Sequence, residues 1–109
     1  MAFAAAGCAN QPLKSDKLQL AQEAVTHAAQ MGGNDYAAGE MQAARDRIAQ
    51  GQLALTNGML AQADSLADEA LVNTRLAEAR VQSVKTQQAA AELRKGNRAL
   101  QSEIQNNLK

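Results

Sequence analysis

The stretch MLAQADSLADEALVNTRLAEARVQSV, residues 59–84, decides the fold of this chain. Small or β-branched residues recur in it at spacings of four and three: Ala63, Ala67, Ala70, Thr74, Ala77, Val81 and Val84. This spacing places them on one face of an α-helix, and alanine is the strongest helix former. From Met59 onward the sequence holds no proline and a single glycine, Gly96. We therefore predict one helix over about 59–108, on the order of 75 Å long.

Two shorter helices are predicted upstream, over about 16–31 and 35–56. Ser15 is a suitable N-cap for the first. The first apolar face consists of Leu18, Ala21, Val25 and Ala28. Gly32 and Gly33 can end this helix, and Asn34 or Asp35 can cap the next. The second apolar face consists of Ala37, Met41, Ala44, Ile48, Gly51 and Leu55, and the turn dipeptide Asn57-Gly58 follows.

The composition supports an all-α fold, with 25 alanines, 12 leucines, one phenylalanine, one tyrosine and no tryptophan in 109 residues. We expect a three-helix unit, in which two short antiparallel helices pack on the first half of the long C-terminal helix. The second half then overhangs as a coiled-coil-like arm. Because an isolated amphipathic helix is marginal in water, this arm either frays or pairs. We expect pairing in a coiled coil, either with copies of itself or with a partner.

The expected interaction arm carries apolar and basic residues. The apolar positions are Leu93, Leu100, Ile104 and Leu108, and Asn97 among them would select the register. Arg94, Lys95 and Arg98 would bias orientation. Residues 1–78 have a net charge of −4 and residues 79–109 of +4, so the arm is mildly basic. This cluster has no neighbouring aromatic residue, which argues against nucleic-acid binding. Lipid head groups, peptidoglycan carboxylates or an acidic partner remain open as its target.

The inventory of chemically active side chains predicts no enzyme, metal site or cofactor. His27, the only histidine, shares a helix face with Glu23, and without a third ligand we expect an exposed hydrogen-bonding pair. Asp64 and Asp68 are one turn apart, which is typical of a solvated helix face. Cys8 is the only cysteine, and nothing holds a base beside it.

The residues AAGC, 5–8, resemble a lipobox, the bacterial lipoprotein signal in which small residues precede a cysteine that receives diacylglycerol. The resemblance implies that residues 1–8 are the remainder of a signal, that Cys8 is the lipidation site, and that residues 9–15 are a linker to a helical domain at 16–109. A basic region and a long apolar core before Cys8 are absent from this sequence. Lys109 resembles the terminal lysine by which Braun-type lipoproteins are joined to peptidoglycan.

Residues 34–83, NDYAAGEMQAARDRIAQGQLALTNGMLAQADSLADEALVNTRLAEARVQS, carry a second resemblance. Tyr36-Ala37, Ala44-Arg45, Asn57-Gly58 and the Ala-x-x-x-Ala spacing are similar to a domain-of-unknown-function family of alanine-rich helical proteins of Gram-negative bacteria. The resemblance covers roughly residues 17–108. It implies an envelope lipoprotein; some relatives carry an OmpA-type peptidoglycan-binding domain.

Together these features favour a non-enzymatic lipoprotein at the periplasmic face of the outer membrane, acting as a structural or protein-interaction module. Two alternatives stay open. One is a soluble helical adaptor without lipid, and the other is a peptidoglycan tether through Lys109.

Overall fold

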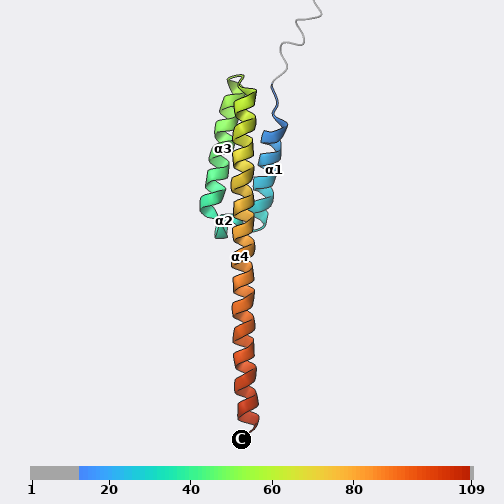
Figure 1. Cartoon of the computed structure of the whole chain (residues 1–109), viewed down its shortest axis with the longest axis vertical. Coiled ribbons are helices and arrows are strands. Elements are labelled where there is room, and N and C mark those ends of the chain that lie inside the picture. The colour runs from blue at the N-terminus through green and yellow to red at the C-terminus, as the bar shows by residue number, and fades with distance from the viewer. Residues whose placement is uncertain (1–12, 109) are drawn as a thin grey trace, which may run out of the picture.

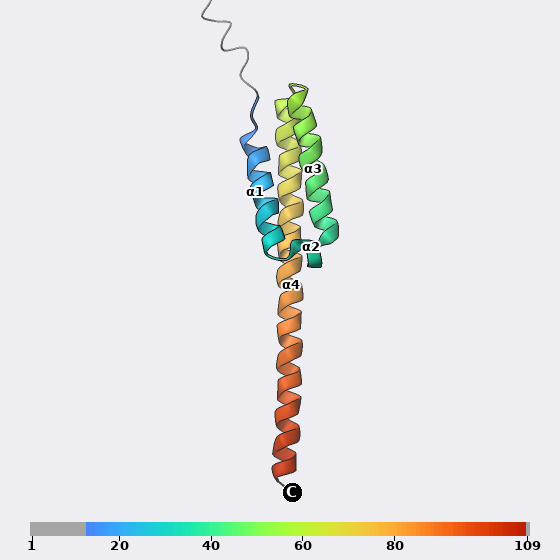
Figure 2. The ribbon, with the colours of Figure 1, turned by 180° about the vertical axis from the view of Figure 1, so that it is seen from behind.

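The computed structural model describes residues 13–108, which form four α-helices and no strand. They are α1 (Asp16–Gln30), α2 (Gly33–Tyr36), α3 (Ala38–Thr56) and α4 (Leu60–Asn107). The described part of the molecule is long and narrow, and the 48 residues of α4 alone extend about 72 Å at the rise of an α-helix. A head contains α1, α2, α3 and the first half of α4, and the rest of α4 projects from it (Figures 1 and 2). The predicted all-α class is confirmed.

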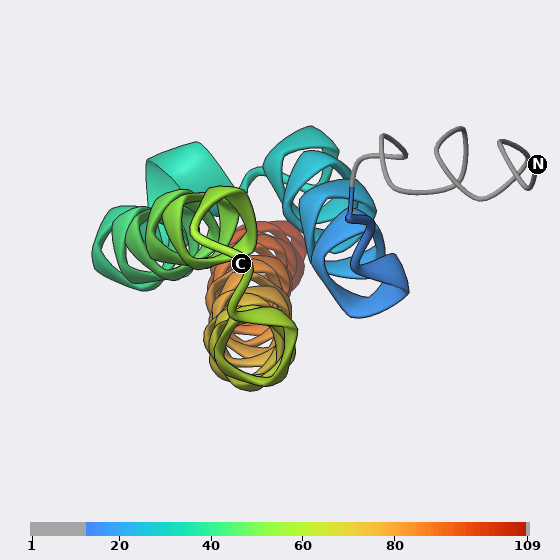
Figure 3. The same cartoon turned by 90° about the horizontal axis from the view of Figure 1, so that it is seen from above.

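The long helix α4 holds the head together. α3 packs on α4 most extensively and α1 next, whereas α1 and α3 contact each other less than either contacts α4. α1 and α4 run in the same direction and α3 runs in the opposite one (Figure 1). Seen along the molecule, α1 and α3 both lie on one side of α4 and leave its other side uncovered (Figure 3).

Small side chains build the core. The predicted face of α4, which we call the inner seam, consists of Ala63, Ala67, Ala70, Thr74, Ala77, Val81 and Val84; the first six are buried and Val84 is half-buried. Alanine at these positions lets neighbouring helix backbones approach closely. The largest fully buried side chains are Met41, Val81 and Thr74. The Thr74 hydroxyl donates to the Ala70 carbonyl at 2.8 Å, so its burial leaves the hydroxyl bonded.

The first helix begins where the sequence predicts. The Leu18 amide donates to Oγ of Ser15 at 3.1 Å, which makes Ser15 the N-cap of α1. After α1 the chain turns at Gly32, whose φ of 105° is in the left-handed region that glycine adopts without strain.

The predicted cap of the second helix is wrong. The chain forms the single turn α2 after Gly32, and α3 then begins at Ala38 with Ala37 as an N-cap that makes no side-chain hydrogen bond. Asn34 instead accepts from Nη2 of Arg45 at 2.7 Å. Burial of Ala37 against the core fixes this helix start, so packing replaces capping.

The long helix continues through Gly96 without a break and ends at Asn107. Cys8 and Lys109, the expected lipidation and peptidoglycan attachment sites, lie outside the described residues. Among residues 13–108, no helix has the length and apolar character needed to span a membrane.

Candidate interaction surface on the long helix

Polar contacts fasten α1 to α4 along one edge of the head. Oγ of Ser15 donates to Oδ1 of Asp64 at 2.5 Å, and Nζ of Lys17 lies 3.0 Å from Oδ2 of Asp68. The pKa of Lys17 is raised from its ordinary value, mainly by the hydrogen bond to Asp68 and next by the attraction of the negative charge of Asp68. The expected solvated face is therefore only part of the picture, since the Asp68 side chain is 55% exposed but both carboxylates also contact the N-terminal turn of α1.

The only histidine is also used between helices. Nδ1 of His27 lies 3.1 Å from Oε1 of Glu78 on α4, while Glu23 accepts from Nε2 of Gln19 at 3.4 Å. The expected pairing of His27 with Glu23 is thus replaced by an interhelical contact. Across residues 13–108 the structure gathers no group of three or more His, Cys, Asp or Glu side chains that could hold a metal ion.

Ion pairs also mark the edge between α3 and α4. Nε of Arg47 lies 2.9 Å from Oε2 of Glu69, and Nη1 of Arg80 donates to Oε1 of Glu40. Both long edges of α4 in the head are therefore occupied by polar contacts with the other helices.

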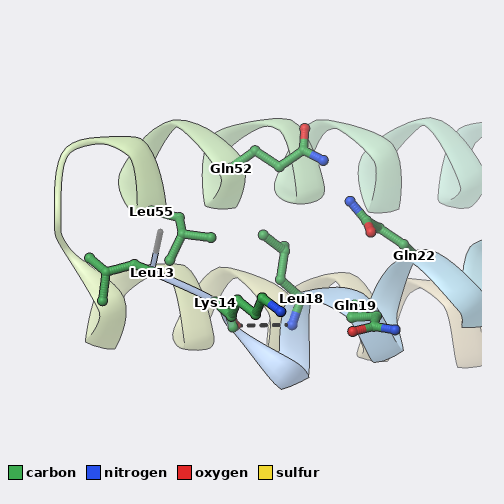
Figure 4. A pocket seen from close by; sticks show the side chains of 8 residues that line it. Leu13, Lys14, Leu18, Gln19, Gln22, Gln52 and Leu55 are labelled. Atoms are coloured by element: carbon green, nitrogen blue, oxygen red, sulfur yellow. Dashed lines mark hydrogen bonds between the residues drawn. The ribbon is translucent and has the colours of Figure 1, made fainter. Parts of the chain in front are cut away.

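A shallow groove of about 440 Å³ opens between α1 and α3 near the start of α1. Leu18 and Leu55 lie on its two sides, with Gln22 and Gln52 facing each other farther along it (Figure 4). Among residues 13–108 its lining is aliphatic and amide, with Lys14 and Ser15 as the remaining polar side chains. This described lining offers no pair of ionisable groups suited to proton transfer.

The projecting half of α4 begins just below the head. Nζ of Lys85 donates to the carbonyl of Met31 at 2.8 Å, at the C-terminal end of α1. We call residues 86–108 the arm; every residue in it is exposed except Ala90, which is half-buried. Four predicted interaction residues are among the most exposed large apolar side chains described: Leu93 at 66%, Leu100 at 57%, Ile104 at 57% and Leu108 at 81%.

The apolar residues of the arm lie on a different face of α4 from the inner seam. Continuing the inner-seam spacing beyond Val84 leads to Gln88, Ala91, Lys95 and Arg98, most of which are polar. Leu93 follows Ala91, the preceding position in that register, by two residues. Since each residue turns an α-helix by about 100°, the apolar stripe of the arm is rotated by about 160° from the face that binds α1 and α3.

The apolar stripe of the arm can be followed upward onto the uncovered side of the head. We call this line the outer seam, and its spacing of four and three is uninterrupted through Val72, Leu76, Ala79, Ser83, Thr86, Ala90, Leu93, Asn97, Leu100 and Ile104. Val72 and Leu76 are 62% and 56% exposed although they belong to the head. The outer seam is thus one solvent-facing stripe along most of α4.

The predicted basic residues are not brought together on that stripe. Lys95 and Arg98 lie in the inner-seam register below the head, and Arg94 flanks the outer seam. The spacing in the sequence predicted the arm but not that Val72, Leu76 and Ala79 belong to the same surface. This surface could have been recognised because Val84 and Leu93 are nine residues apart, a separation that does not fit the spacing of the inner seam.

A known protein family matches most of the chain. Residues 16–93 match the model of a family described as Domain of unknown function (DUF4398). The match covers the head and the first part of the arm. Searches of curated proteins and of solved structures returned no match.

Proposed function

The chain belongs to the family described as Domain of unknown function (DUF4398), and from its surface we propose that it is a non-enzymatic protein-interaction module. The observation that carries the proposal is the outer seam, a heptad stripe that no other described helix covers and that presents five exposed large aliphatic side chains, Val72, Leu76, Leu93, Leu100 and Ile104. Exposed leucine and isoleucine at alternating spacings of four and three are typical of a helix that packs against another helix.

The arm is long enough to act outside the head. Residues 86–108 would extend roughly 35 Å at the rise of an α-helix. Burial of an exposed leucine or isoleucine against a partner contributes about 1.5–3 kcal/mol. Several such side chains on one helix therefore contribute far more binding free energy than a single exposed leucine elsewhere on the head would.

We further propose that the module is held at the periplasmic face of the outer membrane by acyl chains on Cys8. The lipobox-like residues 5–8 support this, and so does the shape of the molecule, since the start of α1 and the C-terminal end of α4 lie at opposite ends (Figure 1). With about 0.8 kcal/mol gained per buried CH₂, a diacylglycerol and an N-terminal acyl chain on Cys8, three chains in all, would make a stable anchor.

The interaction is tested by photo-crosslinking in cells. A photoreactive residue at position 101 flanks the outer seam without replacing any member of it, and the same residue at position 99 lies on the far side of the helix. We expect a strong adduct from position 101 and little or none from position 99. Equal yields from both positions, or no adduct from either, would show that the outer seam is not an interaction surface.

The anchor is tested by metabolic labelling with palmitate of the protein expressed from its own locus. We expect label on the wild type and none on Cys8→Ser. Absence of label on the wild type would favour a soluble adaptor. Loss of peptidoglycan association on deleting Lys109 would favour a tether through that residue.

A further inference from the structure

We propose that the outer seam binds the outer seam of a second copy of this chain, as a parallel and in-register two-stranded coiled coil that extends from Val72 to the end of α4. This rests on the proposed function and names its partner. The interface would include the back of the head as well as the arm.

The first support is the type of residue at each heptad position. Counting from Leu93 as d, the a positions are Leu76, Ser83, Ala90, Asn97 and Ile104, and the d positions include Val72, Ala79, Thr86, Leu93 and Leu100. A β-branched residue at a with leucine at d favours two strands. The lower part of the seam, with Leu93, Asn97, Leu100 and Ile104, follows that rule.

The second support is Asn97, which indicates a parallel orientation. In a parallel in-register pair each a residue faces its own copy, so the two Asn97 amides can hydrogen-bond to each other. In an antiparallel pair, a residues face d residues. In every antiparallel alignment in which Leu93 and Leu100 both face a described residue of α4, Asn97 faces a side chain that is not an amide. An amide left unsatisfied in an interface costs about 1–3 kcal/mol.

The third support is the space and area available. α1 and α3 lie on the opposite side of α4, so two copies can meet through the outer seam without contact between these helices (Figure 3). Between Val72 and Leu108, 22 residues occupy a, d, e and g positions. This agrees with the roughly 20–30 residues a side of a standard stable interface.

Charge does not oppose the pairing. Arg75 at g would approach Arg80 of the partner subunit at e. Each Arg80 is already bonded to Glu40 of its own chain, which offsets this repulsion. Lys95 and Arg98 lie away from the outer seam and stay in solvent.

The orientation is tested by disulfide trapping in a Cys8→Ser background. Leu100→Cys and Val72→Cys lie 28 residues apart in the sequence, and both are at d. We expect each variant to form a covalent homodimer under mild oxidation, since facing d residues are close enough for a disulfide. Ala99→Cys is the control and should stay monomeric. Failure of either seam variant to link to itself would overturn the parallel in-register pair.

Affinity is tested by sedimentation of the full chain. We expect a concentration-dependent dimer, with Leu100→Glu raising the dissociation constant by about 100-fold or more, because two buried leucines are replaced by two charges. Ala99→Glu, one residue away on the other face, should leave the constant unchanged. A monomeric wild type, or equal effects of both variants, would overturn self-pairing.

The photo-crosslink from position 101 separates this inference from the proposed function. An adduct of twice the chain mass supports both. An adduct of any other mass overturns self-pairing and leaves the interaction module standing. Absence of an adduct overturns both.

Discussion

Gly33 in the head and Gly96 in the arm have contrasting surroundings, so substitution by alanine should have opposite effects on stability at the two positions. A Cβ on Gly33 would lie 2.8 Å from the Ala28 carbonyl oxygen and 2.8 Å from Sδ of the fully buried Met41. Because backbone would have to move, we expect Gly33→Ala to destabilise the head by about 1–3 kcal/mol in urea denaturation followed by circular dichroism.

Gly96 provides the matched control. A Cβ there has no atom within 4 Å, and alanine is favoured over glycine in a helix interior by about 1 kcal/mol. Gly96→Ala should therefore raise the helical content and thermal stability of the arm. If Gly33→Ala left the urea midpoint unchanged or raised it, the close packing assigned to Gly33 would be incorrect.

Asn97 should limit the coiled coil to one register and one size. Asn97→Leu removes the only amide at an a position, so we expect tighter association together with species larger than a dimer. Sedimentation velocity of wild type and variant measures both. An unchanged, purely dimeric Asn97→Leu would mean that this side chain does not face its copy.

At the scale of helices, Ser15 joins two elements. Its hydroxyl oxygen caps α1 through the Leu18 amide and its hydrogen is donated to Asp64 of α4. Loss of an N-cap costs about 0.5–2 kcal/mol, and Asp64 also loses its donor. We expect Ser15→Ala to lower the free energy of unfolding by about 1–2 kcal/mol.

An exposed serine on α4 provides the comparison for Ser15. Ser65→Ala should change the free energy of unfolding by less than about 0.5 kcal/mol, as surface substitutions usually do. Equal effects of the two substitutions in urea denaturation would show that Ser15 does not connect α1 to α4.

The helices could be predicted from the sequence because their signals are local. Inner-seam spacing, the Gly32 stop and the Asn57-Gly58 turn each depend on a few neighbouring residues. Capping by Asn34 or Asp35 failed because Ala37 is fixed by tertiary packing.

Contacts between helices were less accessible to sequence reasoning. Asp68 contacts Lys17, which lies 51 residues earlier in the sequence, and no local pattern predicts such a contact. The outer seam is intermediate, because its spacing is local but its exposure depends on where α1 and α3 pack.

At the scale of the whole molecule, the proposed pairing and the proposed anchor agree. The start of α1 lies toward one end of the described structure and the C-terminal end of α4 at the other (Figure 2). In a parallel pair both Cys8 anchors would reach the same membrane. An antiparallel pair would direct them to opposite ends of the assembly.

This geometry predicts an upright molecule on a membrane. Cys8 is the single cysteine, so the full chain can be coupled through it to a maleimide lipid in a supported bilayer. Neutron reflectometry should then measure a protein layer approaching the length of α4, whose 48 residues extend about 72 Å at the rise of an α-helix. A layer much thinner than this would mean that the chain lies flat.

Lipid charge distinguishes the causes of a flat layer. If Arg94, Lys95 and Arg98 draw the arm to anionic head groups, the layer should be thin on anionic bilayers at low salt and thicken in high salt, because salt screens exposed charges. A layer that stays thin on zwitterionic lipid as well would instead place the outer seam against the bilayer. That result would make the exposed leucines membrane contacts and contradict their use in pairing two chains.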